Sequence, residues 1–196
     1  MFAGIVQAVG NIERVEALEQ GLRLTIDTGS LGLADTAIGD SIAVSGACLT
    51  VTSVSGSRIA ADVSRETLEC TAGLAAPGAV NLEKSLRLND RIGGHLVTGH
   101  VDGVGTVSAF DRAGESMRLV VRASQELARY IARKGSITID GVSLTVNRVE
   151  GAQFEVNLIP HSLEVTTLGR LAPGASVNLE VDLLARYLER LLTASK

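Results

Sequence analysis

One stretch of the sequence occurs twice, and this internal repeat constrains the fold more than any other feature. Residues 41–51 (SIAVSGACLTV) align with residues 136–146 (SITIDGVSLTV), and the serine, isoleucine, glycine, leucine, threonine and final valine are identical. At the same offset residues 1–10 align with residues 96–105. With a two-residue gap, PGAVNLE (77–83) aligns with PGASVNLE (173–180). Because the repeat covers nearly the whole chain and is too long for a solenoid unit, it predicts two tandem domains of one fold.

Within each copy, short runs of alternating apolar and polar residues predict β-strands. The clearest runs are residues 41–44, 49–52, 58–63, 80–83, 153–158 and 177–181, and glycine or Pro-Gly turns separate them. Several short strands at close spacing in each copy predict a small closed antiparallel barrel with Greek-key connections. Closure also removes the unpaired edges that such strands present in an open sheet.

Two segments have helical patterns instead. Residues 124–135 begin with a capping serine, place apolar residues at 127, 130 and 131, and end with glycine. Residues 181–196 have no counterpart in the first copy, and Asp182 is placed to cap a helix there. The apolar residues on one face of that helix are Leu184, Tyr187, Leu188, Leu191 and Leu192. This face is covered either by its own chain or by another copy of the chain.

Composition and charge exclude several classes of protein. The formal net charge of −4 is spread along the 196 residues, which argues against nucleic-acid binding. The chain has no tryptophan and 3% aromatic residues, so it offers few side chains on which bases stack. No apolar run reaches the length of a membrane span, and residues 1–10 lack the basic region of a signal peptide. We therefore expect no nucleic-acid partner and no membrane contact.

The two cysteines, Cys48 and Cys70, have no CxxC spacing. Without a secretory signal they are expected to be reduced thiols of a cytoplasmic protein, and a disulfide between them is the alternative. Common catalytic motifs such as GxGxxG, HExxH and GxSxG are absent. His95, His100 and Asp102 come nearest to a metal-ligand cluster, but their spacing is a weak signal, and we expect no metal.

Positions at which the two copies differ in chemistry suggest where the two domains do different work. Each difference alone is explained equally well by drift on a tolerant barrel surface. Together, beside a shared Gly-x-x-Leu-Thr strand, they predict two related but unequal pockets. The differing pairs are Ile5/His100, Ser45/Asp140 and Cys48/Ser143.

Several of these residues also have a purely structural interpretation. Cys48 has the properties of a small buried hydrophobe, and Cys70 is assigned that role. Thr50 and Thr145 are either simple β-formers or hydroxyl groups for a polar ligand. Residues 62–67 and 157–162 are expected to be loops that leave a strand, where Asp, Asn and Ser either contact a ligand or cap a turn.

Longer motifs closely resemble one family, the riboflavin synthases of the two-barrel, lumazine-binding type. The similar blocks, in the same order over essentially the whole chain, are MFAGIV, GACLTV, GGHLVTGHVDGVG, KGSITIDGVSLTV, LIPHSLEVTTLG and VNLEVDLLARYLERLL. The resemblance implies a mainly β protein with two tandem homologous six-stranded antiparallel Greek-key β-barrels and a C-terminal amphipathic α-helix. We expect an N-terminal lumazine-binding barrel over residues 1–95, a C-terminal lumazine-binding barrel over residues 96–181 and an oligomerisation helix over residues 182–196.

The resemblance also implies an activity. In this family two molecules of 6,7-dimethyl-8-ribityllumazine exchange a four-carbon unit, which gives riboflavin and 5-amino-6-(ribitylamino)uracil in the last step of riboflavin biosynthesis. The reaction is a transfer that uses no metal and no organic cofactor. A duplicated barrel suits it, because donor and acceptor are two copies of one substrate and positioning alone lowers a barrier by about 7–11 kcal/mol.

The resemblance further implies partners. In the family the C-terminal helix joins three chains into a homotrimer. Active sites then form between the N-terminal barrel of one chain and the C-terminal barrel of a neighbour. Some relatives are enclosed in a capsid of lumazine synthase, so that enzyme is an expected partner here.

Residue roles follow from the same resemblance, position by position. His100 is expected to transfer protons with Ser143 and Thr145 beside it, while Cys48 acts in the other barrel. The expected catalytic residues are Phe2, Cys48, His100, Asp140, Ser143 and Thr145. The expected substrate-binding residues are Gly4, Ile5, Val6, Cys48, Leu49, Thr50, Asp62, Val63, Ser64, Arg65, Glu66, Thr67, Gly99, His100, Val101, Lys134, Ser143, Leu144, Thr145, Asn157, Leu158, Ile159, Pro160, His161 and Ser162.

The sequence departs from the family pattern in three places. Ala3 and Ser162 stand where threonine is usual, and the segment after Thr71 is two residues shorter, which affects the rim of the first barrel. Non-catalytic relatives that bind lumazine or flavin as a chromophore are the alternative to an enzyme. Those relatives tend to lose the motifs of the second copy, whereas GHVDG and DGVSLTV are intact here, which favours the enzyme.

Overall fold

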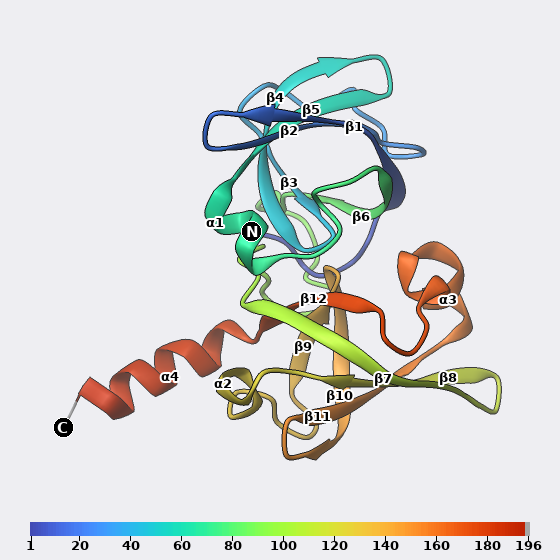
Figure 1. Cartoon of the computed structure of the whole chain (residues 1–196), viewed down its shortest axis with the longest axis vertical. Coiled ribbons are helices and arrows are strands. Elements are labelled where there is room, and N and C mark those ends of the chain that lie inside the picture. Colours follow the sequence, from blue (N-terminus) through green and yellow to red (C-terminus); the bar gives the residue numbers. More distant parts are fainter. Residues whose placement is uncertain (195–196) are drawn as a thin grey trace.

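The computed structural model of the protein describes residues 1–194 and confirms the expected fold class (Figure 1). The chain forms two closed six-stranded antiparallel barrels, one above the other, and ends in a helix. The first barrel consists of β1 (Ala8–Leu18), β2 (Gly21–Asp27), β3 (Ser41–Val44), β4 (Ala47–Ser55), β5 (Arg58–Ser64) and β6 (Gly78–Lys84). The second consists of β7 (Gly103–Ala113), β8 (Ser116–Arg122), β9 (Ser136–Ile139), β10 (Val142–Glu150), β11 (Gln153–Leu158) and β12 (Ser176–Val181). The circular order β1-β2-β5-β4-β3-β6 recurs as β7-β8-β11-β10-β9-β12, as expected for a repeated fold.

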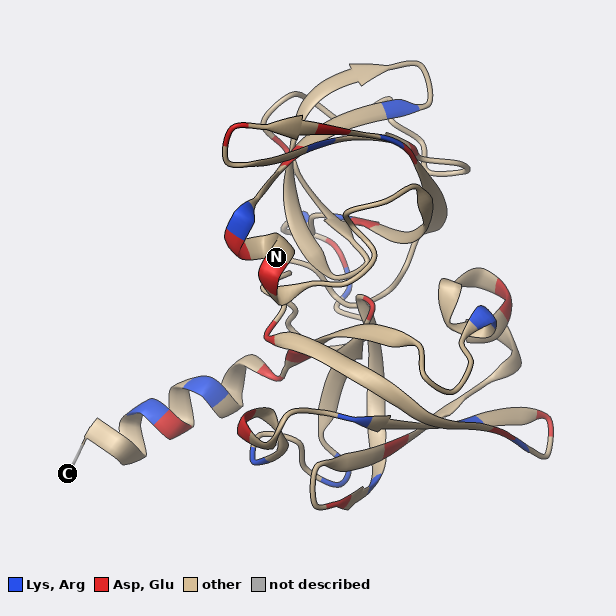
Figure 2. Cartoon of the chain, viewed as in Figure 1, with Lys and Arg blue, Asp and Glu red and all other residues tan. Residues whose placement is uncertain are grey.

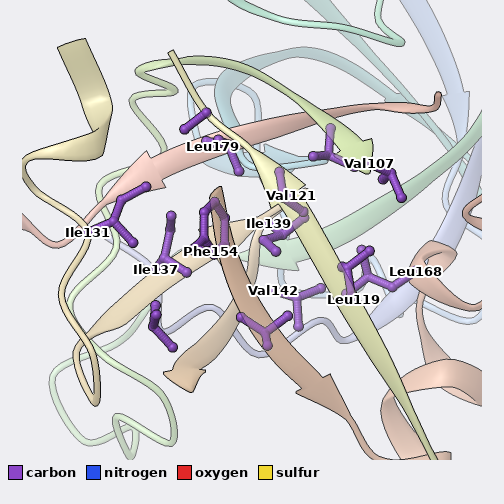
Figure 3. Packing of buried hydrophobic residues seen from close by; sticks show 14 of the residues in the cluster. Val107, Leu119, Val121, Ile131, Ile137, Ile139, Val142, Phe154, Leu168 and Leu179 are labelled. Atoms are coloured by element: carbon purple, nitrogen blue, oxygen red, sulfur yellow. The ribbon is translucent and has the colours of Figure 1, made fainter. Parts of the chain in front are cut away.

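The interior of each barrel is packed with apolar side chains from alternate strand positions. Along β4 the side chains of Leu49 and Val51 point inward, whereas Cys48 and Thr50 lie on the outer face. The core of the second barrel is shown in Figure 3, where residues from several strands converge around Phe154. Because side chains fill small barrels of this kind, a ligand must bind on the outer face or at a rim.

The repeated glycine forms a tight hairpin turn in both barrels. The loop between β3 and β4 is the pair Ser45-Gly46, and the loop between β9 and β10 is the pair Asp140-Gly141. All four residues have positive φ, between 44° and 88°, as a type I′ turn requires. Asp-Gly is a preferred sequence for this turn, so turn chemistry alone accommodates the change from serine to aspartate.

The helix predicted over residues 124–135 is wrong in its length. Helix α2 (Gln125–Ala128) is one turn long, and the Ser124 hydroxyl caps it as expected by accepting the Leu127 N–H at 3.2 Å. Beyond it the chain forms successive tight turns, because Leu127 and Ile131 both insert into the barrel core.

The loops predicted at residues 62–67 and 157–162 are also wrong, because each contains a strand end and the start of a short helix. Helix α1 (Arg65–Cys70) follows β5, and the Ser64 hydroxyl caps it by accepting the Thr67 N–H at 3.2 Å. Helix α3 (Pro160–Val165) follows β11, and a short 3-10 helix, η1 (Thr167–Arg170), comes after it. Pro160 occupies the first turn of α3, where its missing N–H costs no hydrogen bond.

The C-terminal helix α4 (Leu183–Ala194) begins just after β12, and Val181 belongs to the strand. Asp182 accepts the Leu184 N–H at 3.0 Å, which confirms its expected capping role. Residues 195–196 of the predicted helix lie outside the described residues.

Helix α4 projects away from the second barrel, with basic and acidic residues interspersed along it (Figures 1 and 2). Its polar face contacts that barrel: Arg186 forms an ion pair with Asp102, and Glu189 forms one with Arg129 at 3.0 Å. On the other face the apolar side chains remain about two-thirds exposed, for example Leu184 at 73% and Leu192 at 66%. The helix is therefore attached to its own barrel by its charges, and its apolar face is uncovered in the single chain. No helix within residues 1–194 has the length and hydropathy to span a membrane.

Candidate functional site

The two barrels are related by an approximate two-fold axis, because residues that align in the repeat meet each other across it. Phe2 and Val97 exchange two backbone hydrogen bonds, of 2.8 and 3.1 Å. Gly46 and Gly141 approach so closely that a Cβ on either one would lie within 2.9 Å of the other's backbone nitrogen. Only glycine fits at this contact.

Two buried asparagines complete the contact between the barrels. The Asn81 side chain donates to the Asp140 carbonyl at 2.9 Å, and the Asn178 side chain donates to the Ser45 carbonyl at 3.0 Å. The Ser45 hydroxyl accepts the Asn81 N–H at 3.2 Å, and the Asp140 carboxylate accepts the Asn178 N–H at 2.8 Å. The Ser45/Asp140 difference therefore lies between the barrels, where both side chains accept the same kind of backbone bond. Desolvation raises the pKa of Asp140 to about 7 there.

The segment that precedes each barrel crosses to contact the opposite barrel, which we call the exchange of leaders. We call residues 1–6 leader 1 and residues 96–101 leader 2. The Gly4 carbonyl of leader 1 accepts the Ser143 N–H of the second barrel at 2.8 Å. In the equivalent contact, the Gly99 carbonyl of leader 2 accepts the Cys48 N–H of the first barrel at 2.7 Å. Each candidate site is consequently built from both copies of the repeat.

The site at Cys48 is formed by the outer face of β4 and by leader 2. Cys48 is half-buried and packs with Phe2, which is fully buried, whereas Thr50 and His100 are exposed. The exchange of leaders thus brings His100 next to the Cys48 strand through the Gly99 hydrogen bond.

The site at Ser143 is formed by the outer face of β10 and by leader 1. Ile5, beside Gly4, is 48% exposed, and Thr145 is exposed on the same face as Ser143. The Ser143 hydroxyl lies 2.7 Å from Nδ1 of His95, so its imidazole partner is His95 rather than His100. Desolvation lowers the pKa of His95, which favours the neutral ring that accepts a proton from a hydroxyl.

The remaining expected contact residues are spread over the outer faces and the short helices. Asp62 is bound to Arg23 by two hydrogen bonds of 2.7 and 2.8 Å, and the guanidinium lowers the pKa of that carboxyl. Three expected residues point into the barrel cores, so only their backbone atoms are available to a ligand: Leu49, Val63 and Leu158. Several others are exposed: Arg65, Glu66, Asn157, Ile159, Pro160 and His161. The half-buried ones are Val6, Thr67, Val101, Leu144 and Ser162.

Lys134 has a backbone conformation that side chains rarely adopt, with φ of 67°. Its N–H donates to the Val146 carbonyl at 2.7 Å. The aligned residue of the first copy is Gly39, with φ of 97° and an equivalent bond to the Val51 carbonyl. A lysine held where a glycine suffices is consistent with a contact role for its side chain.

The positions at which the copies differ do not include two residues that both copies share and that contact the leaders. Glu83 and Glu180 align in the repeat, are at most 4% exposed, and bind the two leaders. The available signal was the repeated VNLE motif, which places Asn and Glu in otherwise apolar strands. From the sequence alone, His95 is a candidate only as a weak metal ligand. Among residues 1–194 no group of three or more His, Cys, Asp or Glu is arranged to hold a metal ion.

Cys48 and Cys70 are free cysteines, and both are half-buried. A cavity of about 390 Å³ lies elsewhere, where the start of β3 and the end of β6 meet, and it includes none of the expected site residues. Its charged groups are largely paired with each other, since Lys84 and Arg87 both contact Asp35.

Known proteins are similar to this chain in sequence and in architecture. Residues 3–85 and 98–182 each match the sequence profile described as the lumazine binding domain. The chain is 43% identical to a riboflavin synthase of Photobacterium phosphoreum, with 100% of this chain and 91% of the relative covered. It is 47% identical to a riboflavin synthase of Mycobacterium bovis, with both chains covered completely.

Solved structures show the same likeness. The structure of LumP complexed with riboflavin matches with a TM-score of 0.83 and 28% identity, covering 92% of this chain and 99% of that one. LumP complexed with 6,7-dimethyl-8-(1'-D-ribityl) lumazine matches with a TM-score of 0.82 at 27% identity, with the same coverage. The chain therefore belongs to the family of two-domain lumazine-binding proteins that includes the riboflavin synthases.

Proposed function

We propose that the protein is a riboflavin synthase, which converts two molecules of 6,7-dimethyl-8-ribityllumazine into riboflavin and 5-amino-6-(ribitylamino)uracil. The observation that carries this proposal is the pair of equivalent sites, each formed by the leader of one copy and the Gly-x-x-Leu-Thr strand of the other. A dismutation needs donor and acceptor held in opposite roles, and two related but unequal sites provide for that. Similarity to riboflavin synthases over the full chain supports the same reaction.

The two sites differ in the side chain at the aligned positions 48 and 143 and in the histidine that accompanies it. At one site the Ser143 hydroxyl is hydrogen-bonded to a half-buried imidazole, that of His95, which suits proton transfer. At the other site the backbone bond between Cys48 and Gly99 places leader 2 beside the Cys48 strand, so a thiol and the exposed imidazole of His100 belong to one site. The class we propose is a transferase that moves a four-carbon unit, with no metal or organic cofactor.

A homotrimer with active sites between chains fits the uncovered surfaces. The outer-face side chains Thr50, His100 and Thr145 are exposed in the single chain, and so is the apolar face of α4. A neighbouring chain would cover both, and ordering two bulky substrates requires such cover. The free thiols favour the cytoplasm. A partnership with lumazine synthase is proposed only from the family resemblance.

The product assay is the decisive test. Purified protein supplied with 6,7-dimethyl-8-ribityllumazine and buffer alone should release riboflavin and 5-amino-6-(ribitylamino)uracil in equal amounts. Chromatography and absorbance measure the two products. Metal, nucleotide or a carbon donor should not be required. Tight binding of the lumazine without either product would instead identify a carrier of the chromophore. That second candidate is favoured by the structural likeness to LumP, which has been solved with lumazine and with riboflavin.

Replacing Lys134 by glycine should stabilise the fold and weaken substrate binding. Relief of the left-handed backbone at this position should raise the free energy of unfolding by about 1 kcal/mol. Loss of the side chain should raise KM for the lumazine several-fold. Urea unfolding and initial rates measure the two effects. The matched control is Gly39→Lys, which has open space around its Cβ and should lose about 1 kcal/mol of stability. An unchanged KM for Lys134→Gly would remove Lys134 from the site.

A further inference from the structure

Each leader is bound by a buried carboxylate of its own barrel. Glu83 of β6 accepts the Ala3 N–H at 2.7 Å with Oε1 and the Gly4 N–H at 3.0 Å with Oε2. Its counterpart on β12, Glu180, accepts the Thr98 N–H at 2.7 Å and the Gly99 N–H at 2.9 Å in the same way. Since each oxygen accepts one N–H, the two bonds to a leader are both at full strength only when the carboxyl is ionised.

A single glycine of each leader connects a carboxylate to the strand that carries a candidate site. Glu83 holds the N–H of Gly4, and the Gly4 carbonyl accepts the N–H of Ser143 in the other barrel. Glu180 holds the N–H of Gly99, and the Gly99 carbonyl accepts the N–H of Cys48. Each carboxylate therefore fixes one leader against the site of the opposite barrel.

The donors to the two carboxylates differ in one hydroxyl group. Thr98 donates a third hydrogen bond to Oε1 of Glu180 from its side chain, at 2.7 Å. The aligned residue in leader 1 is Ala3, which has no hydroxyl to donate to Glu83. Glu180 therefore has a hydroxyl donor in addition to two backbone N–H groups. The donors to Glu83 are all backbone N–H groups, those of Ala3 and Gly4 and, to a lesser extent, Ile5.

Burial and neighbouring charged groups also shift the pKa values of the two carboxylates. Burial raises the pKa of Glu83 to about 7, against the opposing effect of the leader N–H groups and the amino group of Met1. Burial also raises the pKa of Glu180, where the hydrogen bonds from Thr98 and Gly99 oppose the shift. The carboxylate of Asp102, itself paired with Arg186, adds to that upward shift.

We propose that Glu83 and Glu180 are positioning residues for the two substrate sites, and that Ala3 makes the Ser143 site lose its leader in mild acid while the Cys48 site keeps its own. This proposal rests on the proposed function only in taking the two sites to bind lumazine. Protonation converts one carboxylate oxygen into a hydroxyl, which no longer accepts an N–H in the same geometry. Leader 1 is then free to move away from Ser143.

Protonation of Glu83 has opposite effects on the stability of the fold and on the Ser143 site. The pKa of Glu83 is higher in the folded protein than in the unfolded chain, so its contribution to stability is present below the unfolded pKa and is lost as the pH rises through about 7. Acidification from about pH 8 to about pH 6 should therefore loosen the Ser143 site without unfolding the protein through this group. A merely structural role for Glu83 predicts no such separation.

The test is the variant Ala3→Thr, which supplies leader 1 with the missing hydroxyl. Lumazine binding by calorimetry and riboflavin formation are each measured from about pH 5.5 to about pH 8.5. In the wild type, binding at the Ser143 site should weaken about ten-fold over the pH unit below a midpoint near 7. In Ala3→Thr the midpoint should move to lower pH, so that the variant binds several-fold more tightly than the wild type at about pH 6. The matched variant Thr98→Ala should give the Cys48 site a new loss of binding in acid.

Two further measurements decide between explanations. Carbon NMR of the Glu83 carboxyl should show its midpoint moving downward in Ala3→Thr, with or without substrate. The neutral variant Glu83→Gln should weaken the Ser143 site at every pH and remove the pH dependence of its binding. If lumazine binding weakens identically at low pH in the wild type and in Ala3→Thr, and the protein forms riboflavin, the positioning proposal is wrong and the proposed function stands. A shifted binding midpoint in a protein that forms no riboflavin supports the proposal and overturns the reaction.

Discussion

A variant lacking residues 184–196 should be monomeric and should form riboflavin at less than about one-hundredth of the wild-type rate. The apolar face of α4 is uncovered in the single chain, and its polar face is bound to the second barrel by Arg186 and Glu189. If this face joins neighbouring chains, its removal leaves each barrel without the partner that completes a site. Misplacement of a substrate by about 1 Å already costs about a hundred-fold in rate. Light scattering and the product assay measure the two effects.

Single substitutions on α4 distinguish loss of the interface from general damage. Leu188→Glu places a charge on the apolar face and should reproduce both defects. Arg190→Ala changes an exposed charged residue of the same helix and should leave the oligomer intact. A truncated monomer with full activity would show that one chain contains a complete active site, and the inter-chain proposal would be abandoned.

Replacing Gly99 by alanine should unfold or severely weaken the contact between leader 2 and the first barrel. Gly99 has φ of 80°, and an added Cβ would lie 2.6 Å from the Cys48 Cβ and 2.9 Å from the Phe2 ring. The left-handed backbone and the overpacking together should cost about 2–5 kcal/mol of unfolding free energy. The Cys48 site should lose its alignment, with a fall in activity greater than the fall in stability explains. Denaturant unfolding and lumazine binding are the measurements.

A matched control isolates the packing part of this effect. Gly114 lies in the β7–β8 hairpin with a similar φ of 67°, and its added Cβ would meet nothing within 4 Å. Gly114→Ala should therefore cost only the backbone contribution, about 1 kcal/mol, and leave binding unaffected. Equal losses in the two variants would mean that the contact of leader 2 with Cys48 has no energetic importance.

The repeat and the alternation of apolar residues were enough to predict two β-barrels. Leu49 and Val51 alternate with Cys48 and Thr50, and that period of two places the first pair in the core and the second pair outside. The capping roles of Ser124 and Asp182 were also readable, because a helix start depends on a few neighbouring residues. The length of α2 was not, because Leu127 and Ile131 are held by the barrel core rather than by helical packing.

Parts of the candidate site were predicted by position, but their partners were not. The sequence singled out Cys48, Ser143 and His100 as unlike residues at equivalent places. It did not indicate that His95 would contact Ser143, or that the Asn81 side chain would bind the Asp140 carbonyl between the barrels. Those contacts join segments that are distant in the chain and of different copies, so no local pattern encodes them.

The sequence by itself determined the fold, the duplication and the outward placement of Cys48 and Ser143, because these depend on periodicity within one segment. Only the tertiary structure decided the exchange of leaders, which puts Gly4 against Ser143 and Gly99 against Cys48. It also decided the different bonding of Glu83 and Glu180, since the hydroxyl of Thr98 matters only once a buried carboxylate lies beside it. Local periodicity fixes which way a side chain points, whereas the packing of the two barrels fixes what it meets.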